Sequence, residues 1–229
     1  MLTYTEKVLE MQVDSQDRRL LANRTYDRLN AEEFVLGPPE SVEDDYIVEN
    51  CNFVDCVVKP GPLMVLGGVQ LRNVVFDNMR ANDAFTIYSD CLLDKVTIRG
   101  NSESAGLWIK PNEPETPEID DQRLRKRMSA MASRVKMMLN ISEFDGPTVE
   151  ILGIPPEKVS MNKSRHVVLR RSTRIDWKKL GVPSHSLWRI RLMKLNALGI
   201  DVGIYHVPFK EENEVAFREF ELLRCRGLV

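Results

Sequence analysis

Pairs of apolar residues separated by a single position recur through the middle of the chain at intervals of 22 or 23 residues. The first set of pairs is Cys51 and Phe53, Val74 and Phe76, and Val96 and Ile98. The second set is Leu63 and Val65, Phe85 and Ile87, and Leu107 and Ile109. Apolar residues with a period of two predict strands with one inward face, and recurrence at a fixed interval predicts stacked coils.

Turn-forming residues separate these predicted strands at Pro60 to Pro62, Gly67 and Gly68, Asn82 and Asp83, and Gly100 and Asn101. One coil cannot bury its inward face alone, so neighbouring coils must stack with strands about 4.8 Å apart. The pattern therefore predicts a short right-handed parallel β-helix of about three coils over residues 46–113. A three-stranded antiparallel meander is the alternative.

A short unit within the first coil, Asn52 to Cys56, centres on the inward Phe53. This part of the chain resembles irregular right-handed parallel β-helix proteins, including the pentapeptide-repeat type. The resemblance covers about 65 of the 229 residues, and the five-residue period is not sustained. It implies stacked coils over residues 46–110.

The ends of such a stack must be covered, because an open sheet edge invites pairing with other chains. Residues 15–33 begin with a candidate cap, Ser15, and an acidic first turn at Asp17. Apolar residues follow at Leu20, Leu21 and Leu29. We expect a capping helix here, within a helical N-terminal cap over residues 1–45.

The outward positions of the second strand set carry large side chains that need a cover. They are Met64, Thr86 and Trp108, followed one position later by Leu66, Tyr88 and Lys110. A connecting helix within residues 114–142, at about 120–139, offers an apolar stripe able to pack there: Leu124, Met128, Met131, Val135 and Met138. The alternative is an interface with a partner or a second copy through Met64, Leu66, Tyr88 and Trp108.

The C-terminal part, residues 143–229, alternates strand and helix patterns and predicts a small α/β domain. We expect strands at 148–153, 166–171 and 200–207, and helices at 184–198 and 212–224. Gly199 marks the end of the first of these helices. The fold class is therefore α+β, with a parallel β-helix preceding the α/β domain.

The run from Leu187 to Val207, with Glu143 to Pro147 upstream of it, resembles restriction-endonuclease-like families, and the carboxylates of such a site would be Asp145 and Glu150. The resemblance implies a Mg²⁺-dependent nuclease, since Mg²⁺ prefers carboxylate ligands and such sites add a lysine to assist the attacking water. Residue 152 is Leu rather than that lysine. The alternative is that Asp145 binds no metal and is simply a turn residue.

Composition is that of an ordinary globular chain, with 43% hydrophobic and 29% charged residues. No apolar run approaches the roughly 18 residues of a membrane span, and the N-terminal residues are too charged for a signal peptide. We expect a cytoplasmic protein that does not bind membranes. The four cysteines, Cys51, Cys56, Cys91 and Cys225, have no metal-ligand or disulfide-framework spacing.

Charge is unevenly distributed although the net charge is −2. Residues 1–50 hold 12 acidic and five basic side chains, whereas residues 158–194 hold 11 basic side chains and one acidic residue, Asp176. Such a basic run is typical of a surface for an acidic partner, unless the acidic N-terminal region docks on it. The candidate binding residues are Lys163, Arg165, Arg170, Arg171, Arg174, Lys178, Lys179, Arg189 and Lys194.

The sequence contains no motif for metal binding, phosphate binding or glycoside hydrolysis. His166, His185 and His206 lack metal-ligand spacing, and there is no Gly-rich phosphate loop. In the predicted register, no two carboxylates stack on the outer face as a glycosidase would need. We therefore identify no catalytic residue, no metal site and no cofactor.

These patterns together predict a non-catalytic interaction or scaffold protein whose basic C-terminal surface binds an acidic macromolecule. Nucleic acid is the first candidate, because phosphate backbones are neutralised by Lys and Arg. An immunity-type inhibitor that binds a protein toxin, and a Mg²⁺-dependent nuclease-like enzyme with a degenerate site, are the alternatives. A homodimer would also fit the apolar outward positions.

Overall fold

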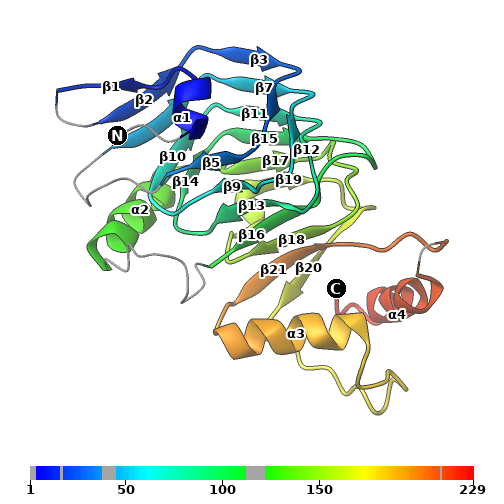
Figure 1. Cartoon of the computed structure of the whole chain (residues 1–229). Coiled ribbons are helices and arrows are strands. Elements are labelled where there is room, and N and C mark those ends of the chain that lie inside the picture. The colour runs from blue at the N-terminus through cyan, green and yellow to red at the C-terminus, as the bar shows by residue number, and fades with distance from the viewer. Residues whose placement is uncertain (1–3, 16–17, 38–44, 112–121, 212) are drawn as a thin grey trace.

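The computed structural model describes residues 4–15, 18–37, 45–111, 122–211 and 213–229. Its main body is a parallel β-solenoid of about five turns (Figure 1). The strands of successive coils pair in parallel, which rules out an antiparallel meander. The predicted β-helix is thus confirmed, but it has about five turns rather than three.

Four sheets form the walls of the solenoid. The first contains, in spatial order, β1 (Gln12–Val13), β2 (Arg19–Ala22), β6 (Tyr46–Glu49), β10 (Val69–Arg72) and β14 (Leu92–Asp94). The second contains β3 (Thr25–Asp27), β7 (Asn52–Val54), β11 (Val75–Asp77), β15 (Val96–Arg99), β17 (Leu139–Ile141) and β19 (Val159–Met161). A short third sheet contains β4 (Asn30–Ala31), β8 (Val57–Val58) and β12 (Arg80–Ala81).

The fourth sheet has seven strands and continues past the solenoid. It contains, in spatial order, β5 (Phe34–Leu36), β9 (Leu63–Val65), β13 (Phe85–Tyr88), β16 (Leu107–Lys110), β18 (Val149–Leu152), β21 (Val202–His206) and β20 (His166–Arg170). All pairs up to β18 are parallel, whereas β21 is antiparallel to both β18 and β20.

Stacked side chains fill the interior in the predicted register. In the second sheet the inward column is Tyr26, Phe53, Phe76, Ile98, Ile141 and Met161. In the fourth sheet it is Leu36, Val65, Ile87, Ile109, Ile151, Ile204 and Val168. The ring of Phe53 stacks on those of Tyr26 and Phe76, with centroid distances of 5.1 and 5.2 Å. These columns form the main hydrophobic core.

Corners between the first two sheets are made by residues in the left-handed backbone region. They are Asn23, Asn50, Asn73 and Lys95, with φ of 56°, 51°, 52° and 56°. Asn tolerates this region better than most residues. The Nδ2 of Asn50 donates to Oδ1 of Asn23 at 3.2 Å, and the Nδ2 of Asn73 donates to Oδ1 of Asn50 at 2.8 Å. Each side-chain amide therefore donates a hydrogen bond to the side-chain amide of the preceding coil.

The helix predicted over residues 15–33 does not form, because the described part of this segment makes the strands of the first coil, β2 to β4. Leu21 is buried and Leu20 is exposed, so the two leucines alternate across a strand instead of sharing a helical face. A short helix, α1 (Tyr4–Val8), lies next to β5, and Leu9 and Met11 enter the core.

Helix α2 (Gln122–Arg134) lies between β16 and β17 in sequence and packs on the first sheet, where Met128 contacts Leu92. It does not cover the outward positions of the fourth sheet as predicted. Met138, expected on this helix, is buried in the core just before β17. Residue 120 and the side chain of Leu124 lie outside the described residues.

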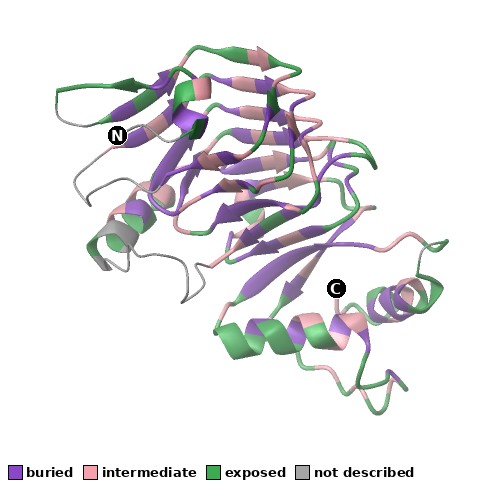
Figure 2. Ribbon diagram, in the orientation of Figure 1, coloured by how far each residue is buried: buried purple, intermediate pink, exposed green. Residues whose placement is uncertain are grey.

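The C-terminal elements lie at the end of the solenoid. Helix α3 (Leu187–Leu198) lies beneath β20 and β21, and helix α4 (Glu214–Cys225) lies beyond the N-terminal end of α3 and contacts it there (Figure 1). Strand β19 follows the short 3-10 helix η1 (Pro156–Lys158). Figure 2 shows β21 buried along its whole length. Strands β17 and β18 continue the solenoid, so the sequence-based boundary at residue 143 falls inside the β-helix. Among the described helices, none has the length and apolar character needed to span a membrane.

Candidate functional site

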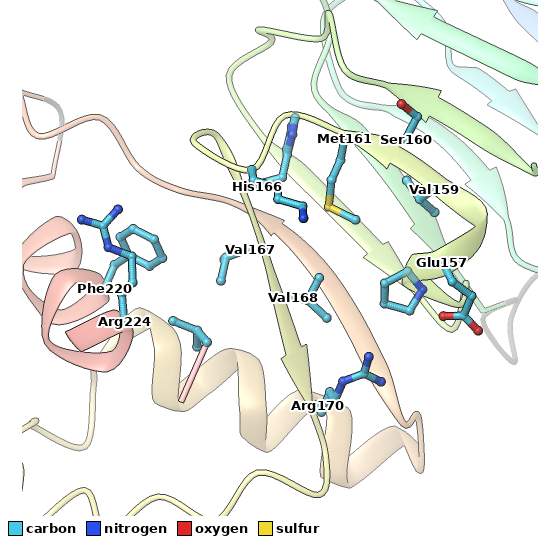
Figure 3. Close-up of a pocket in the computed structure, with 13 residues that line it drawn as sticks. Glu157, Val159, Ser160, Met161, His166, Val167, Val168, Arg170, Phe220 and Arg224 are labelled. Atoms are coloured by element: carbon cyan, nitrogen blue, oxygen red, sulfur yellow. The ribbon is translucent and has the colours of Figure 1, made fainter. Parts of the chain in front are cut away.

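A groove with a volume of about 700 Å³ lies along β20 at the C-terminal end of the solenoid. Figure 3 shows Val159 and Met161 of β19 on one side of β20, and Phe220 and Arg224 of α4 on the other. Val168 faces the core of the solenoid and Val167 faces the cluster under α3 and α4. The groove therefore reaches both faces of one strand.

The groove exists because the two long sheets end at different levels. Beyond β18 the fourth sheet gains β21 and β20, whereas beyond β17 the second sheet gains only β19. Met161 and Val168 are the last members of the two inward columns, and both are only half-buried. The core of the solenoid thus opens into the groove.

Cationic side chains surround this apolar floor. Lys163 and Arg170, both predicted as binding residues, line the groove and are exposed. Arg224 joins them from α4, with its Nη2 2.6 Å from Oε2 of Glu221. Glu157 is the acidic side chain of the lining. An anion with an apolar body matches this arrangement better than a cation does.

Two buried histidines lie at the start of the groove. His166 lines it, and His206 is its cross-strand neighbour on β21; they are 3% and 4% exposed. Burial, with a smaller contribution from the charge of Arg165, lowers the pKa of each to about 4. Both rings are therefore neutral at pH 7. Neither ring nitrogen of His166 has a hydrogen-bond partner among the described residues.

Several of the other predicted basic residues already have acidic partners in the C-terminal half. Nη1 of Arg165 lies 3.1 Å from Oδ1 of Asp145, and Nη2 of Arg171 lies 2.6 Å from Oδ1 of Asp201. Lys194 forms an ion pair with Glu150. The basic stretch is therefore not one continuous surface. None of these three partners comes from the acidic N-terminal region.

The remaining predicted cations lie away from the groove. Arg174, Lys178 and Lys179 are exposed between β20 and α3, and Arg189 is half-buried in the first turn of α3. No ion pair is formed by these four side chains within the described residues. They give a second, separate group of charges.

The predicted apolar interface on the fourth sheet is largely closed. Tyr88 is buried, and Met64 and Leu66 are half-buried. Trp108 is 42% exposed, with Nζ of Lys110 5.8 Å from its ring centroid.

Helix α3 carries an exposed apolar stripe that the sequence analysis missed: Ile190, Met193 and Leu198 are 50%, 58% and 48% exposed. Its opposite face, with Trp188, Leu192 and Leu195, is buried. The signal was present, because apolar residues occur on all sides of this helix while a half-buried helix ordinarily shows one polar face.

The carboxylates of the nuclease hypothesis do not form a metal site. Asp145 lies at the turn after β17 and pairs with Arg165, whereas Glu150 lies on β18 and pairs with Lys194. Leu152 is fully buried under α3. Across the described ranges, no group of three or more His, Cys, Asp or Glu side chains is arranged to hold a metal ion.

Comparison with known proteins returned no match among family models, curated proteins or solved structures. No match supports the likeness to pentapeptide-repeat proteins or to nuclease-like families, and the parallel β-solenoid supports only the general likeness to β-helix proteins.

Proposed function

We propose that this protein is a non-catalytic binding protein whose C-terminal end holds an acidic protein partner. One observation carries the proposal: the groove combines an apolar floor, formed by Met161, Val168 and Phe220, with the cations Lys163 and Arg170. Apolar side chains of a partner fit the floor, and its carboxylates fit the rim.

A protein partner fits better than nucleic acid. Sequence-independent binding of a nucleic acid strand uses a track of cations together with exposed aromatic rings on which bases stack. In the basic stretch, Trp188 is buried and Trp177 is half-buried against the C-terminal core. The exposed stripe of α3 also favours protein, because exposed apolar patches commonly mark protein interfaces.

Selection from a displayed library of random peptides, with the intact protein as bait, tests this function. We expect the recovered peptides to be rich in Asp, Glu and apolar residues. Synthetic copies should bind the wild-type protein, measured by fluorescence anisotropy, and lose about tenfold or more in affinity when Lys163→Glu and Arg170→Glu are combined.

The matched control combines Lys178→Glu and Lys179→Glu, which changes the net charge equally outside the groove. This control should keep peptide affinity within about twofold of wild type. A library that yields no acidic binder contradicts the proposal. Tight binding of a short DNA duplex that only the control variant abolishes would instead support nucleic acid as the partner.

A further inference from the structure

Strand β20 is the last strand of the fourth sheet and pairs with β21 on one side only. The amide of Val207 donates to the carbonyl of Arg165 at 2.8 Å, and the amide of Arg171 donates to the carbonyl of Asp201 at 2.8 Å. In an antiparallel pair such hydrogen-bonded positions alternate. Residues 165, 167, 169 and 171 therefore direct their backbone groups towards β21.

The residues between them, His166, Val168 and Arg170, direct their backbone groups towards the open edge. The amide of His166 donates to the carbonyl of Asn162 at 2.8 Å, and the carbonyl of Arg170 accepts from Thr173 at 2.9 Å. This leaves the carbonyl of His166, both groups of Val168 and the amide of Arg170 with no partner in the described part of the chain. One further strand would pair with all four.

The groove lies along this edge. Val168, Arg170 and His166 line it together with residues on both faces of β20. A strand added here would send alternate side chains to opposite faces. One set would contact Val159 and Met161 at the end of the solenoid, and the other would contact Phe220 and Val229.

Exposed edge strands are normally blunted by a covering loop or helix. At the N-terminal end of the solenoid, α1 lies next to β5, and Leu9 and Met11 are buried in the core. At the C-terminal end, the edge of β20 faces a cavity large enough for several side chains. The edge of β20 is therefore accessible to an added strand.

We propose that the free edge of β20 pairs with an extended acidic segment of the partner protein, which becomes an eighth strand of the sheet. The proposal rests on the proposed function and specifies its mode of binding, β-strand addition. Lys163, Arg170 and Arg224 select carboxylates near the ends of the segment, and the floor of the groove takes apolar side chains at alternate positions.

The substitution Val168→Pro tests the backbone pairing. Proline removes the amide hydrogen that faces the groove and leaves the bonds to β21 intact, because edge strands accept proline at such positions. We expect affinity for the tightest-binding acidic peptide of the library to fall about tenfold or more. Val168→Ala, which shortens the side chain but keeps the amide, should lose at most about threefold.

Hydrogen exchange on the wild-type protein gives a second readout that does not depend on how the proline variant folds. The amides of Val168 and Arg170 should exchange quickly in the free protein and become protected when the same peptide is bound. The amide of Leu169, which points to β21, should be protected in both states.

The outcomes separate the two proposals. Peptide binding without protection of Val168 and Arg170, or with unchanged affinity in Val168→Pro, overturns strand addition and leaves the binding function standing. Failure to recover any acidic peptide overturns both. A dimer of the free protein that Val168→Pro dissociates, seen by analytical ultracentrifugation, would make a second copy the occupant and overturn the acidic partner.

Discussion

Single residues at the groove make this protein sensitive to acid. His166 and His206 have pKa values of about 4 in the folded chain, mainly because of burial, against an ordinary value of about 6.5. The unfolded chain therefore binds protons more readily than the folded chain. The contribution of these two histidines to stability is fully present above about pH 6.5 and is lost as the pH falls towards 4.

We expect the free energy of unfolding to fall by about 1 kcal/mol per histidine between about pH 7 and pH 5.5. Replacing His166 and His206 by Gln should remove most of this pH dependence, because an amide does not titrate. Urea denaturation at both pH values measures it. His185→Gln, at an exposed position, is the control and should keep the wild-type dependence. Equal slopes in both variants would refute the assignment.

At the same scale, the corner asparagines show what single-residue reading misses. Asn50 and Asn73 have positive φ and share side-chain hydrogen bonds, yet in the sequence they are isolated polar residues beside apolar pairs. Their ladder depends on residues 23 positions apart. Only the stacking of coils brings the two amides together.

At the scale of elements, α3 and α4 depend on one buried side chain. Trp188 of α3 is 0% exposed, packs on Phe220, and its Nε1 donates to the carbonyl of Ala216 at 2.7 Å. This contact anchors α4, which forms one wall of the groove. The C-terminal helices should therefore loosen separately from the solenoid when it is removed.

Trp188→Ala should lower the free energy of unfolding by about 3–5 kcal/mol, since it opens a large cavity and removes a buried hydrogen bond to the carbonyl of Ala216. Hydrogen exchange should show loss of protection in α4 while the strands of the solenoid stay protected. Met193→Ala, an exposed change on the same helix, should alter stability by less than about 0.5 kcal/mol. Uniform loss of protection across the chain would show that the helices and the solenoid unfold together.

At the scale of the whole molecule, the two ends of the solenoid are treated differently. The N-terminal end is held by a buried ion pair, in which Nη1 of Arg19 lies 2.7 Å from Oε1 of Glu6, with Arg19 over the ring of Tyr46 at 5.8 Å. The C-terminal end opens into the groove. The stability of a stack of coils depends on the interfaces between neighbouring coils, so the contacts at each end contribute to the stability of the whole stack.

Glu6→Ala should cost about 3–5 kcal/mol, because it removes the carboxylate from a buried ion pair with Arg19. The measurement is urea denaturation of the full chain. Glu10→Ala, whose side chain is 77% exposed, is the matched control and should change stability by less than about 1 kcal/mol. A small effect of Glu6→Ala would mean that the N-terminal end does not hold the stack.

The number of coils shows where sequence periodicity stops being informative. Phe53, Phe76 and Ile98 follow one another by 22 or 23 residues, but Tyr26 precedes Phe53 by 27 and Ile141 follows Ile98 by 43. The longer intervals hide the first and last coils. In space these coils stack like the others, since their strands pair in parallel with those of the neighbouring coils.

The basic stretch of residues 158–194 is continuous in the sequence, but its side chains lie at separate places in the folded protein. Lys163 and Arg170 line the groove, whereas Arg165, Arg171 and Lys194 form ion pairs with carboxylates on other elements. Strand and helix geometry sends neighbouring side chains in different directions, so a linear cluster need not be a surface. Met161, Val168 and Arg224 could not be assigned to a site beforehand, because they meet only through long-range contacts.

The sequence by itself determined the inward register of the central coils, since alternation with a period of two fixes which side chains share a face. Tertiary structure alone decided that β21 inserts between β18 and β20. That insertion carries one sheet a strand further than its neighbour and leaves the edge of β20 open. It depends on pairing between segments distant in sequence, which no local pattern encodes.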